Sequence, residues 1–138
     1  MRRASFFVFV WMFGAGFACS QAIQATSVLD LRYKPTEFAE LTVSFSGYLP
    51  AGDSLNLYVY MSSETAYRQD KAYAVAILES TDTLKTVRRS CKAGYVHVIG
   101  MFIVEGDDME GYIVPDLITE YEGSSDAGPR ICWDRREN

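Results

Sequence analysis

The chain has 138 residues and a formal net charge of −5, and 49% of its residues are hydrophobic. This length suits a small domain with a limited core. An acidic surface repels phosphate backbones, and no basic stripe with interleaved aromatic residues is present, so we expect no nucleic acid among the partners. A basic protein, a cationic peptide, a metal ion or a neutral ligand is compatible with this charge.

Residues 1–20 have the pattern of a secretory signal peptide. Arg2 and Arg3 form a basic start, and an uncharged apolar run follows from Ala4 to Ala18. This run is shorter than the ~20 apolar residues that span a bilayer, so we expect its removal and no transmembrane segment. The mature chain would then be periplasmic or secreted, and loss of both arginines would change its net charge from −5 to −7.

Two processing routes are open at the end of this segment. The small residues Ala18 and Ser20 suit cleavage by signal peptidase. The alternative is a bacterial lipobox at residues 16–19, in which Cys19 is acylated and the protein becomes an outer-membrane lipoprotein with a lipid anchor. By either route, Cys19 is not available to form a disulfide in the folded mature chain.

Hydrophobic periodicity predicts three strands in the first part of the mature chain. Residues 41–49 and 55–61 alternate strictly between apolar and polar side chains, and the turn at residues 51–54 makes them a hairpin. A polar loop at residues 63–71 leads to a third strand at residues 72–78, which is apolar on both faces and therefore more buried.

A short amphipathic helix is predicted next. Ser80 suits its N-cap, and Gly94 supplies its end. Leu84, Val87 and Cys91 fall on one face of this helix, which we expect to point inward.

Two further strands follow at residues 95–104 and 112–121, separated by a loop at residues 105–111. Pro115 indicates an edge or a bulge in the fifth strand. An unpaired edge there would need cover from a second copy or from the polar, Gly-rich tail at residues 123–138.

Cysteine usage indicates a disulfide. Without Cys19, Cys91 and Cys132 form an even pair in an oxidising compartment, and Trp133 would pack beside their bond. Closing this loop of about 40 residues would stabilise the fold by roughly 4 kcal/mol in the chain-entropy model. Two cysteines and the lone His97 are too few for a zinc site, so we expect no metal and no cofactor.

The order of three strands, a helix and two strands is that of an OB-fold, a five-stranded Greek-key barrel. Several phrases also resemble a group of exported bacterial OB-fold-like domains of uncharacterised function, in which an L-x-x-x-P-x-x-F lead-in precedes a V-x-V-x-G-Y-L strand. The chain departs from this group near Ala39 and Glu40, which lack the usual Gly-containing turn, and in its extension with Cys132. The resemblance covers residues 28–121 and implies no catalytic motif. The segments that carry the resemblance are residues 28–31, 35–38, 43–49, 57–62 and 94–102.

The predicted organisation is therefore mainly β. It consists of a signal peptide at 1–20, a lead-in at 21–40, the OB-fold-like barrel at 41–122 and the tail at 123–138.

Tyrosines form the first candidate site. Tyr48, Tyr58, Tyr60 and Tyr73 lie on the phase opposite the core residues of the first three strands. OB-folds bind oligomers on this sheet face, and exposed tyrosines stack on sugar rings or peptide side chains. The alternative is that they only stabilise the sheet as cross-strand pairs.

Carboxylates in the loop before the fifth strand form the second candidate site. Glu105, Asp107, Asp108 and Glu110 could hold a basic partner or coordinate calcium through their carboxylate oxygens. Against calcium, their spacing fits no EF-hand loop, and acidic turn residues are often merely solvated. Catalysis is not expected, because His97 is the single histidine, and nucleophile elbow, HExxH and P-loop motifs are absent.

Two functional hypotheses follow. In the first, this is a non-catalytic binding module of the cell envelope whose tyrosine-bearing face takes a peptide or glycan. In the second, it is a small inhibitor, immunity-type or accessory protein that binds a secreted basic protein through its acidic loop.

Overall fold

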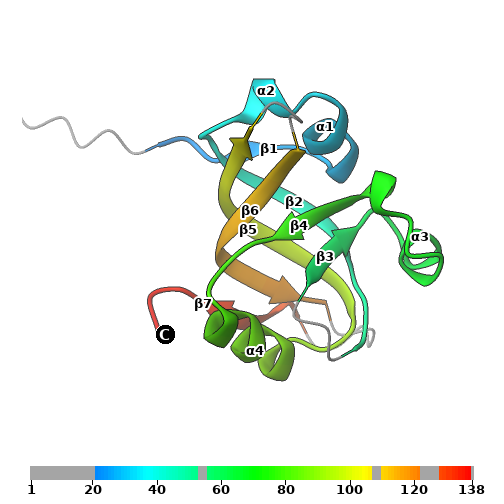
Figure 1. The fold of residues 1–138 in the computed structure, drawn as a ribbon. Coiled ribbons are helices and arrows are strands. Elements are labelled where there is room, and N and C mark those ends of the chain that lie inside the picture. Colours follow the sequence, from blue (N-terminus) through cyan, green and yellow to red (C-terminus); the bar gives the residue numbers. More distant parts are fainter. Residues whose placement is uncertain (1–20, 53–55, 107–109, 122–127, 138) are drawn as a thin grey trace, which may run out of the picture.

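The computed structural model describes residues 21–52, 56–106, 110–121 and 128–137, and its centre is a closed five-stranded β-barrel (Figure 1). Around the barrel the order is β2-β3-β4-β6-β5, and β5 pairs back with β2. β4 and β6 are parallel, while the other neighbouring barrel strands are antiparallel. This confirms the predicted OB-fold-like barrel. The strands are β2 (Thr42–Leu49), β3 (Leu57–Tyr60), β4 (Ala74–Ile77), β5 (Gly94–Glu105) and β6 (Glu110–Glu120).

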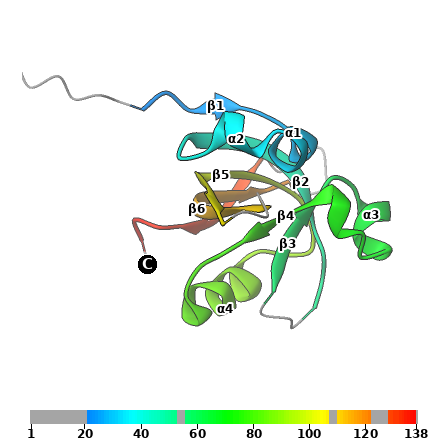
Figure 2. The same cartoon turned by 45° about the horizontal axis from the view of Figure 1, so that its top comes forward.

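Helices lie at both ends of the barrel (Figures 1 and 2). α4 (Thr81–Ser90) connects β4 to β5 at one end, and the side chain of its N-cap Ser80 accepts a hydrogen bond from the backbone N–H of Thr83, as predicted. At the other end lie α1 (Val28–Tyr33) and α2 (Pro35–Phe38), two short helices in the lead-in.

The core fills the barrel and reaches both ends. Its largest fully buried side chains are Phe45 of β2 and Phe102 of β5. Alternate residues of β2 are buried, as the periodicity predicted, and Leu84 and Val87 of α4 point into the same core.

The segment between β3 and β4 differs from the prediction. A polar loop was expected at residues 63–71, but the chain forms α3 (Ser63–Tyr67) and a 3₁₀ turn, η1 (Lys71–Tyr73). Ser62 and Thr65 form a capping box, in which each side chain accepts a hydrogen bond from the other residue's backbone N–H. This local bonding begins a helix that periodicity alone did not indicate.

Two short strands extend the barrel sheet. β1 (Gln24–Ala25) pairs with β2 in parallel, and β7 (Arg130–Asp134), from the expected tail, pairs with β6. The strand that contains Pro115 is therefore not an edge along its length, because β4, β5 and β7 all pair with it. Its register with β5 shifts where Gly100 faces Pro115, which confirms the bulge interpretation.

The C-terminal strand is tied to the barrel by covalent and ionic links. Cys91 and Cys132 form the predicted disulfide, and Trp133 is buried beside it. The buried Glu120 carboxylate accepts hydrogen bonds from the Lys92 backbone N–H at 2.9 Å and from Arg130 Nε at 2.7 Å. Burial alone would raise the pKa of Glu120, but these donors and the Arg130 charge outweigh it and hold the pKa below its ordinary value.

Gly47 lets β2 approach β3 closely. A Cβ atom at this position would lie 2.5 Å from Val59 Cγ1 and 2.6 Å from the Tyr60 carbonyl oxygen. Both distances are shorter than van der Waals contact, and one of the atoms belongs to the backbone, so the strands would have to separate to admit any side chain.

Gly47→Ala should therefore lower the free energy of unfolding by about 1–3 kcal/mol, as overpacking does in cores. Gly128→Ala is the matched control, since a Cβ there meets nothing within 4 Å. Denaturant unfolding of both variants measures the difference. Equal stability of the two variants would contradict the close approach.

Glu120→Gln tests the ion pair between the buried Glu120 carboxylate and the half-exposed Arg130 side chain. Because the folded-state pKa of Glu120 is lowered, its contribution is fully present above the ordinary carboxyl pKa of about 4.3 and is lost as the pH falls through the folded value. We expect the variant to be less stable by about 1–2 kcal/mol at neutral pH. The difference should shrink below about pH 4.

Urea unfolding at a series of pH values measures the difference in the free energy of unfolding between Glu120→Gln and the wild type. Glu64→Gln is the control, because Glu64 pairs with Arg68 on the exposed surface of α3, where ion pairs contribute little. A Glu120→Gln deficit that stays constant down to low pH would argue against an ionised Glu120 in the fold.

Candidate ligand-binding groove

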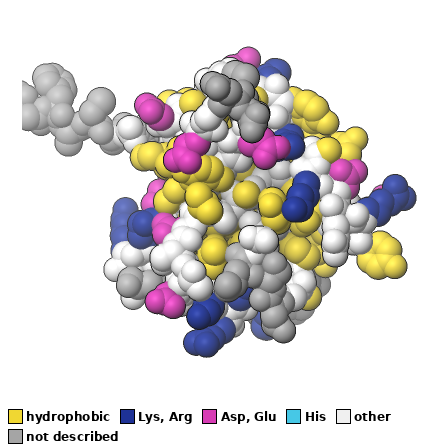
Figure 3. Space-filling model, in the orientation of Figure 1, with side chains coloured by type: hydrophobic (Ala, Val, Ile, Leu, Met, Phe, Trp, Pro, Cys, Tyr) yellow, Lys and Arg dark blue, Asp and Glu magenta, His cyan; other side chains and the backbone are white. Residues whose placement is uncertain are grey.

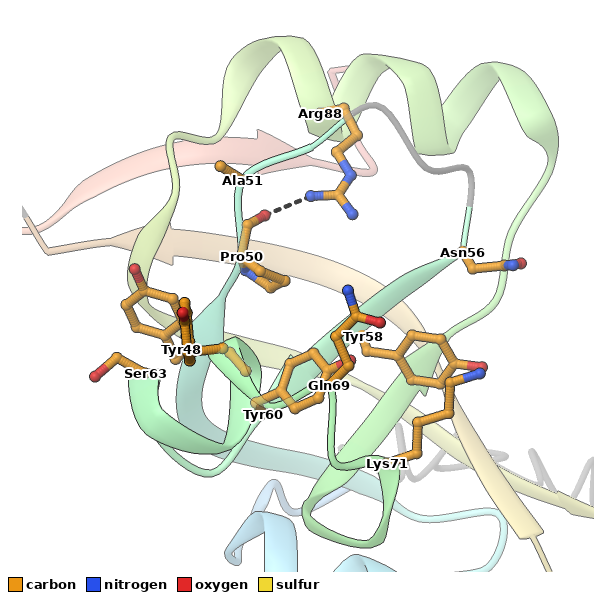
Figure 4. A pocket seen from close by; sticks show the side chains of 12 residues that line it. Tyr48, Pro50, Ala51, Asn56, Tyr58, Tyr60, Ser63, Gln69, Lys71 and Arg88 are labelled. Carbon is orange, nitrogen blue, oxygen red and sulfur yellow. Dashed lines mark hydrogen bonds between the residues drawn. The ribbon is translucent and has the colours of Figure 1, made fainter.

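A groove with a volume of about 640 Å³ lies on the outer surface of β2 and β3, between α3 and α4 (Figure 4). It contains three of the four tyrosines singled out in the sequence. The described lining residues are Tyr48, Pro50, Ala51, Asn56, Tyr58, Tyr60, Ser63, Ala66, Tyr67, Gln69, Lys71 and Arg88.

The groove opens where two strands part. β2 and β3 are in register at Tyr48 and Tyr60, beside the close approach at Gly47, and no further pair follows toward the connecting loop among the described residues. The Pro50 carbonyl accepts a hydrogen bond of 2.6 Å from Arg88 Nη1 of α4. Arg88 thus reaches between the diverging strands and forms one wall.

Tyrosine rings make the floor. Tyr60 is 5% exposed and packs with Ala66 of α3 and Ala74 of β4, while Tyr48 and Tyr58 are half-buried against this cluster. The ring centroids of Tyr58 and Tyr60 are 6.2 Å apart. The expectation of freely exposed rings is therefore wrong for Tyr60, because α3 covers the ring where a loop was expected.

The fourth predicted tyrosine lies elsewhere. Tyr73 ends η1, is half-buried and does not line the groove. Its backbone carbonyl accepts a hydrogen bond from the Met61 N–H, which places it in the link between β3 and β4.

Sequence reasoning missed Tyr67, which lines the groove and is 91% exposed. Figure 3 shows a hydrophobic side chain projecting from the region of α3 at the edge of the molecule. The signal that could have found this residue is the Ser62-x-x-Thr65 pattern, since a helix beginning there brings residues 63–69 back over the tyrosine face.

Two cations border the tyrosines on opposite sides (Figure 4). Lys71 Nζ lies 4.9 Å from the ring centroid of Tyr58, a cation–π contact, and Arg88 descends from α4. Burial raises the pKa of Tyr60, and the charges of Lys71 and Arg88 both oppose this rise. Both positive charges therefore act on the same hydroxyl inside the groove.

Gln69 points into the groove from a strained backbone position (Figure 4). Its φ is 53°, in the left-handed region that favours glycine. The Gln69 and Asp70 N–H groups bond to the Ala66 and Thr65 carbonyls, which is the pattern of a Schellman motif at the end of α3. A residue with a side chain thus stands where glycine would be easier to accommodate.

The acidic loop lies far from the groove, next to α1 and α2 (Figure 1). Glu105 accepts a 2.7 Å hydrogen bond from the Tyr112 hydroxyl, which raises the pKa of Tyr112, and Glu110 accepts one of 3.1 Å from Arg32 of α1. Asp107 and Asp108, like Cys19, lie outside the described residues. Both described carboxylates thus have partners within the chain.

The histidine also has a partner in the sheet. Ser46 Oγ and His97 Nδ1 are 3.0 Å apart across β2 and β5, so the fold does bring a serine to the histidine. Within the described part of the chain no carboxylate hydrogen-bonds to the imidazole, and neither residue lines the groove. No cluster of three His, Cys, Asp or Glu side chains suited to a metal is found there either.

A second cavity, of about 550 Å³, lies beside β1 and the C-terminal turn. Its Arg135 forms ion pairs with Glu79 and Asp116, and Arg135 Nε donates to the Pro115 carbonyl at 3.0 Å. Because no aromatic side chain is found among the described residues that line this cavity, the tyrosine groove is the stronger candidate site.

Neither a known protein family nor a curated protein matches this sequence in our comparisons. Among the described residues, none of the helices has both the length and the apolar character needed to span a bilayer. The candidate site therefore rests on the geometry of the groove.

Gln69→Gly should raise the free energy of unfolding by about 0.5–1 kcal/mol, because glycine relieves the left-handed strain. Glu40→Gly is a matched comparison, since Glu40 has a φ of 62° and lies outside the groove. Thermal unfolding of both variants measures the effect. A loss of stability in Gln69→Gly alone would show that the glutamine side chain stabilises the fold.

Proposed function

We propose that this protein is an exported, non-catalytic binding module that holds a small glycan or peptide of the cell envelope in the tyrosine groove. The observation that carries the proposal is the composition of this groove, which combines tyrosine rings with the side-chain amides of Asn56 and Gln69. Such sites pair flat apolar surfaces with a few polar groups that orient the ligand.

Position and size support the same function. OB-folds bind oligosaccharides and other oligomers on the face of their second and third strands and on adjacent loops, and the groove shares the second of these strands, β3, and the segment that follows it. The volume of about 640 Å³ falls within the range of about 300–1,000 Å³ typical of small-ligand sites.

Export is proposed from the sequence of residues 1–20 and is supported by the disulfide between Cys91 and Cys132, since such bonds persist in oxidising compartments. The inhibitor hypothesis has weaker support. Glu105 and Glu110 already accept hydrogen bonds from Tyr112 and Arg32, whereas the groove offers an open surface.

Tyr67→Ala tests the groove. Because Tyr67 is 91% exposed, its loss should change stability by less than about 0.5 kcal/mol, and loss of an aromatic contact should weaken ligand binding about two- to tenfold. Tyr33→Ala, at a tyrosine that is 65% exposed on α1, should change stability equally little and leave ligand binding unaltered.

The probes are purified oligosaccharides and short peptides released from bacterial cell walls, titrated into isotopically labelled protein and followed by amide chemical shifts. We expect perturbations to centre on residues 56–71 and to diminish in Tyr67→Ala. Perturbations centred on β5 and β6, with Tyr67→Ala behaving as wild type, would argue against this site.

A further inference from the structure

A row of tyrosines leads out of the groove onto the neighbouring strands. Tyr48 of β2 lines the groove, and its partner in register on β5 is Tyr95. The two ring centroids are 5.3 Å apart and the ring planes meet at 82°, which is an edge-to-face contact. Tyr95 does not line the groove and is 50% exposed. The aromatic surface therefore continues past the groove onto β5.

The row extends one strand further, to β6. The Tyr121 backbone N–H donates a hydrogen bond of 3.1 Å to the Tyr95 carbonyl, which continues the ladder between β5 and β6 by one residue. The preceding residue, Glu120, is buried, so alternation along the strand places Tyr121 on the outer face, where it is 50% exposed. With neighbouring strands about 4.8 Å apart, the backbone positions of Tyr48 and Tyr121 span about 10 Å.

A polar row lies beside the tyrosine row, two residues away along each strand. Ser46, His97 and Thr119 are partners in register on β2, β5 and β6. Residues two apart on a strand face the same side, so this row shares the outer face with the tyrosines. Ser46 Oγ and His97 Nδ1 are 3.0 Å apart, and each orients the other. Within the described part of the chain, the second ring nitrogen of His97 and the Thr119 hydroxyl have no hydrogen-bond partner.

The two rows together match a sugar chain better than a peptide. A sugar ring presents C–H groups on its face, which pack on aromatic rings, and hydroxyl groups at its edge, which bond to side chains that donate or accept. The rows offer these two kinds of contact side by side across three strands. An extended peptide adds instead to an open sheet edge, and β5 pairs with β2 on one side and with β6 on the other.

Continuity with the groove identifies the occupant of this face. Tyr48 belongs to both surfaces, because it lines the groove and also begins the tyrosine row. A chain that starts in the groove and passes Tyr48 meets Tyr95 next and then Tyr121. The ligand of the groove is therefore the molecule that reaches these rings.

We propose that the groove holds one end of an oligosaccharide, and that the sugar chain continues over Tyr95 and Tyr121 with its hydroxyl groups toward Ser46, His97 and Thr119. This inference rests on the proposed function. It assigns a glycan rather than a peptide to the groove and adds binding positions outside it.

The length of the sugar chain is the variable that tests this inference. The probes are a disaccharide, a tetrasaccharide and a hexasaccharide of one cell-wall glycan, prepared without peptide and titrated calorimetrically into the mature protein. The hexasaccharide should bind roughly tenfold more tightly than the disaccharide, because two further aromatic contacts form. In isotopically labelled protein, the hexasaccharide should also shift the amides of residues 95–97 and 119–121, which the disaccharide leaves unchanged.

Four variants assign the gain in affinity to the two rows. Tyr95→Ala, Tyr121→Ala and Thr119→Val should each weaken binding of the hexasaccharide several-fold and leave binding of the disaccharide unchanged. Tyr95→Phe keeps the ring and its contact with Tyr48, so it should retain most of the gain. Met101→Ala is the matched control and should alter neither affinity, since Met101 is 37% exposed on the same face of β5 but lies outside both rows.

Two results with the glycans would overturn the extension. Equal affinity for all three lengths, with shifts confined to the groove, would leave the binding module standing without it. A gain with length that survives both Tyr95→Ala and Tyr121→Ala would show that the chain leaves the groove by another route. An extended peptide with the same length dependence would overturn the sugar assignment.

Sedimentation at rising protein concentration tests the remaining occupant, a second copy of the chain. Dimer formation that Tyr121→Ala abolishes, with no glycan bound to the row, would assign this face to the dimer and overturn the inference. If no glycan binds but a cell-wall peptide shifts the groove amides, the inference fails and the proposed function stands. If no probe shifts the groove amides, both proposals fail.

Discussion

The close approach of β2 and β3 at Gly47 is the constraint on which the rest of this structure depends. It joins the first two strands of the barrel at the Tyr48–Tyr60 pair, and beyond this pair they part. The same short contact thus closes the apolar core at this point and sets where the groove begins on the outer surface. A side chain at position 47 would disturb both, because the strands would have to separate where the core and the groove share a wall.

α4 and the C-terminal strand keep this wall in place. α4 carries Arg88 to the Pro50 carbonyl and ends at Cys91, whose disulfide holds β7. Glu120 joins the same region through the Lys92 N–H and the Arg130 side chain. The helix that supplies one cation of the groove is therefore fixed by a covalent bond and by a buried carboxylate with its hydrogen bonds satisfied, which limits its movement.

The groove also shows how local and global charge can differ. The net charge governs approach over distances of a Debye length, whereas contact depends on the few groups that face the ligand. Lys71 and Arg88 belong to η1 and α4, so their positions on opposite sides of the tyrosines depend on the fold. The left-handed φ of Gln69 lies at the same groove, and such strain persists only where the surrounding structure holds it.

The amino-acid sequence by itself determined the barrel, the helix α4 and the disulfide, because alternation, capping and cysteine count are local or compositional signals. It also indicated the tyrosine face, since side chains alternate along a strand. Only the tertiary structure decided that α3 buries Tyr60 and that residues of β2, β3, α3 and α4 line one groove. It likewise decided that the tail adds β7 to β6. Those outcomes depend on contacts between distant segments, and no periodicity within one segment encodes them.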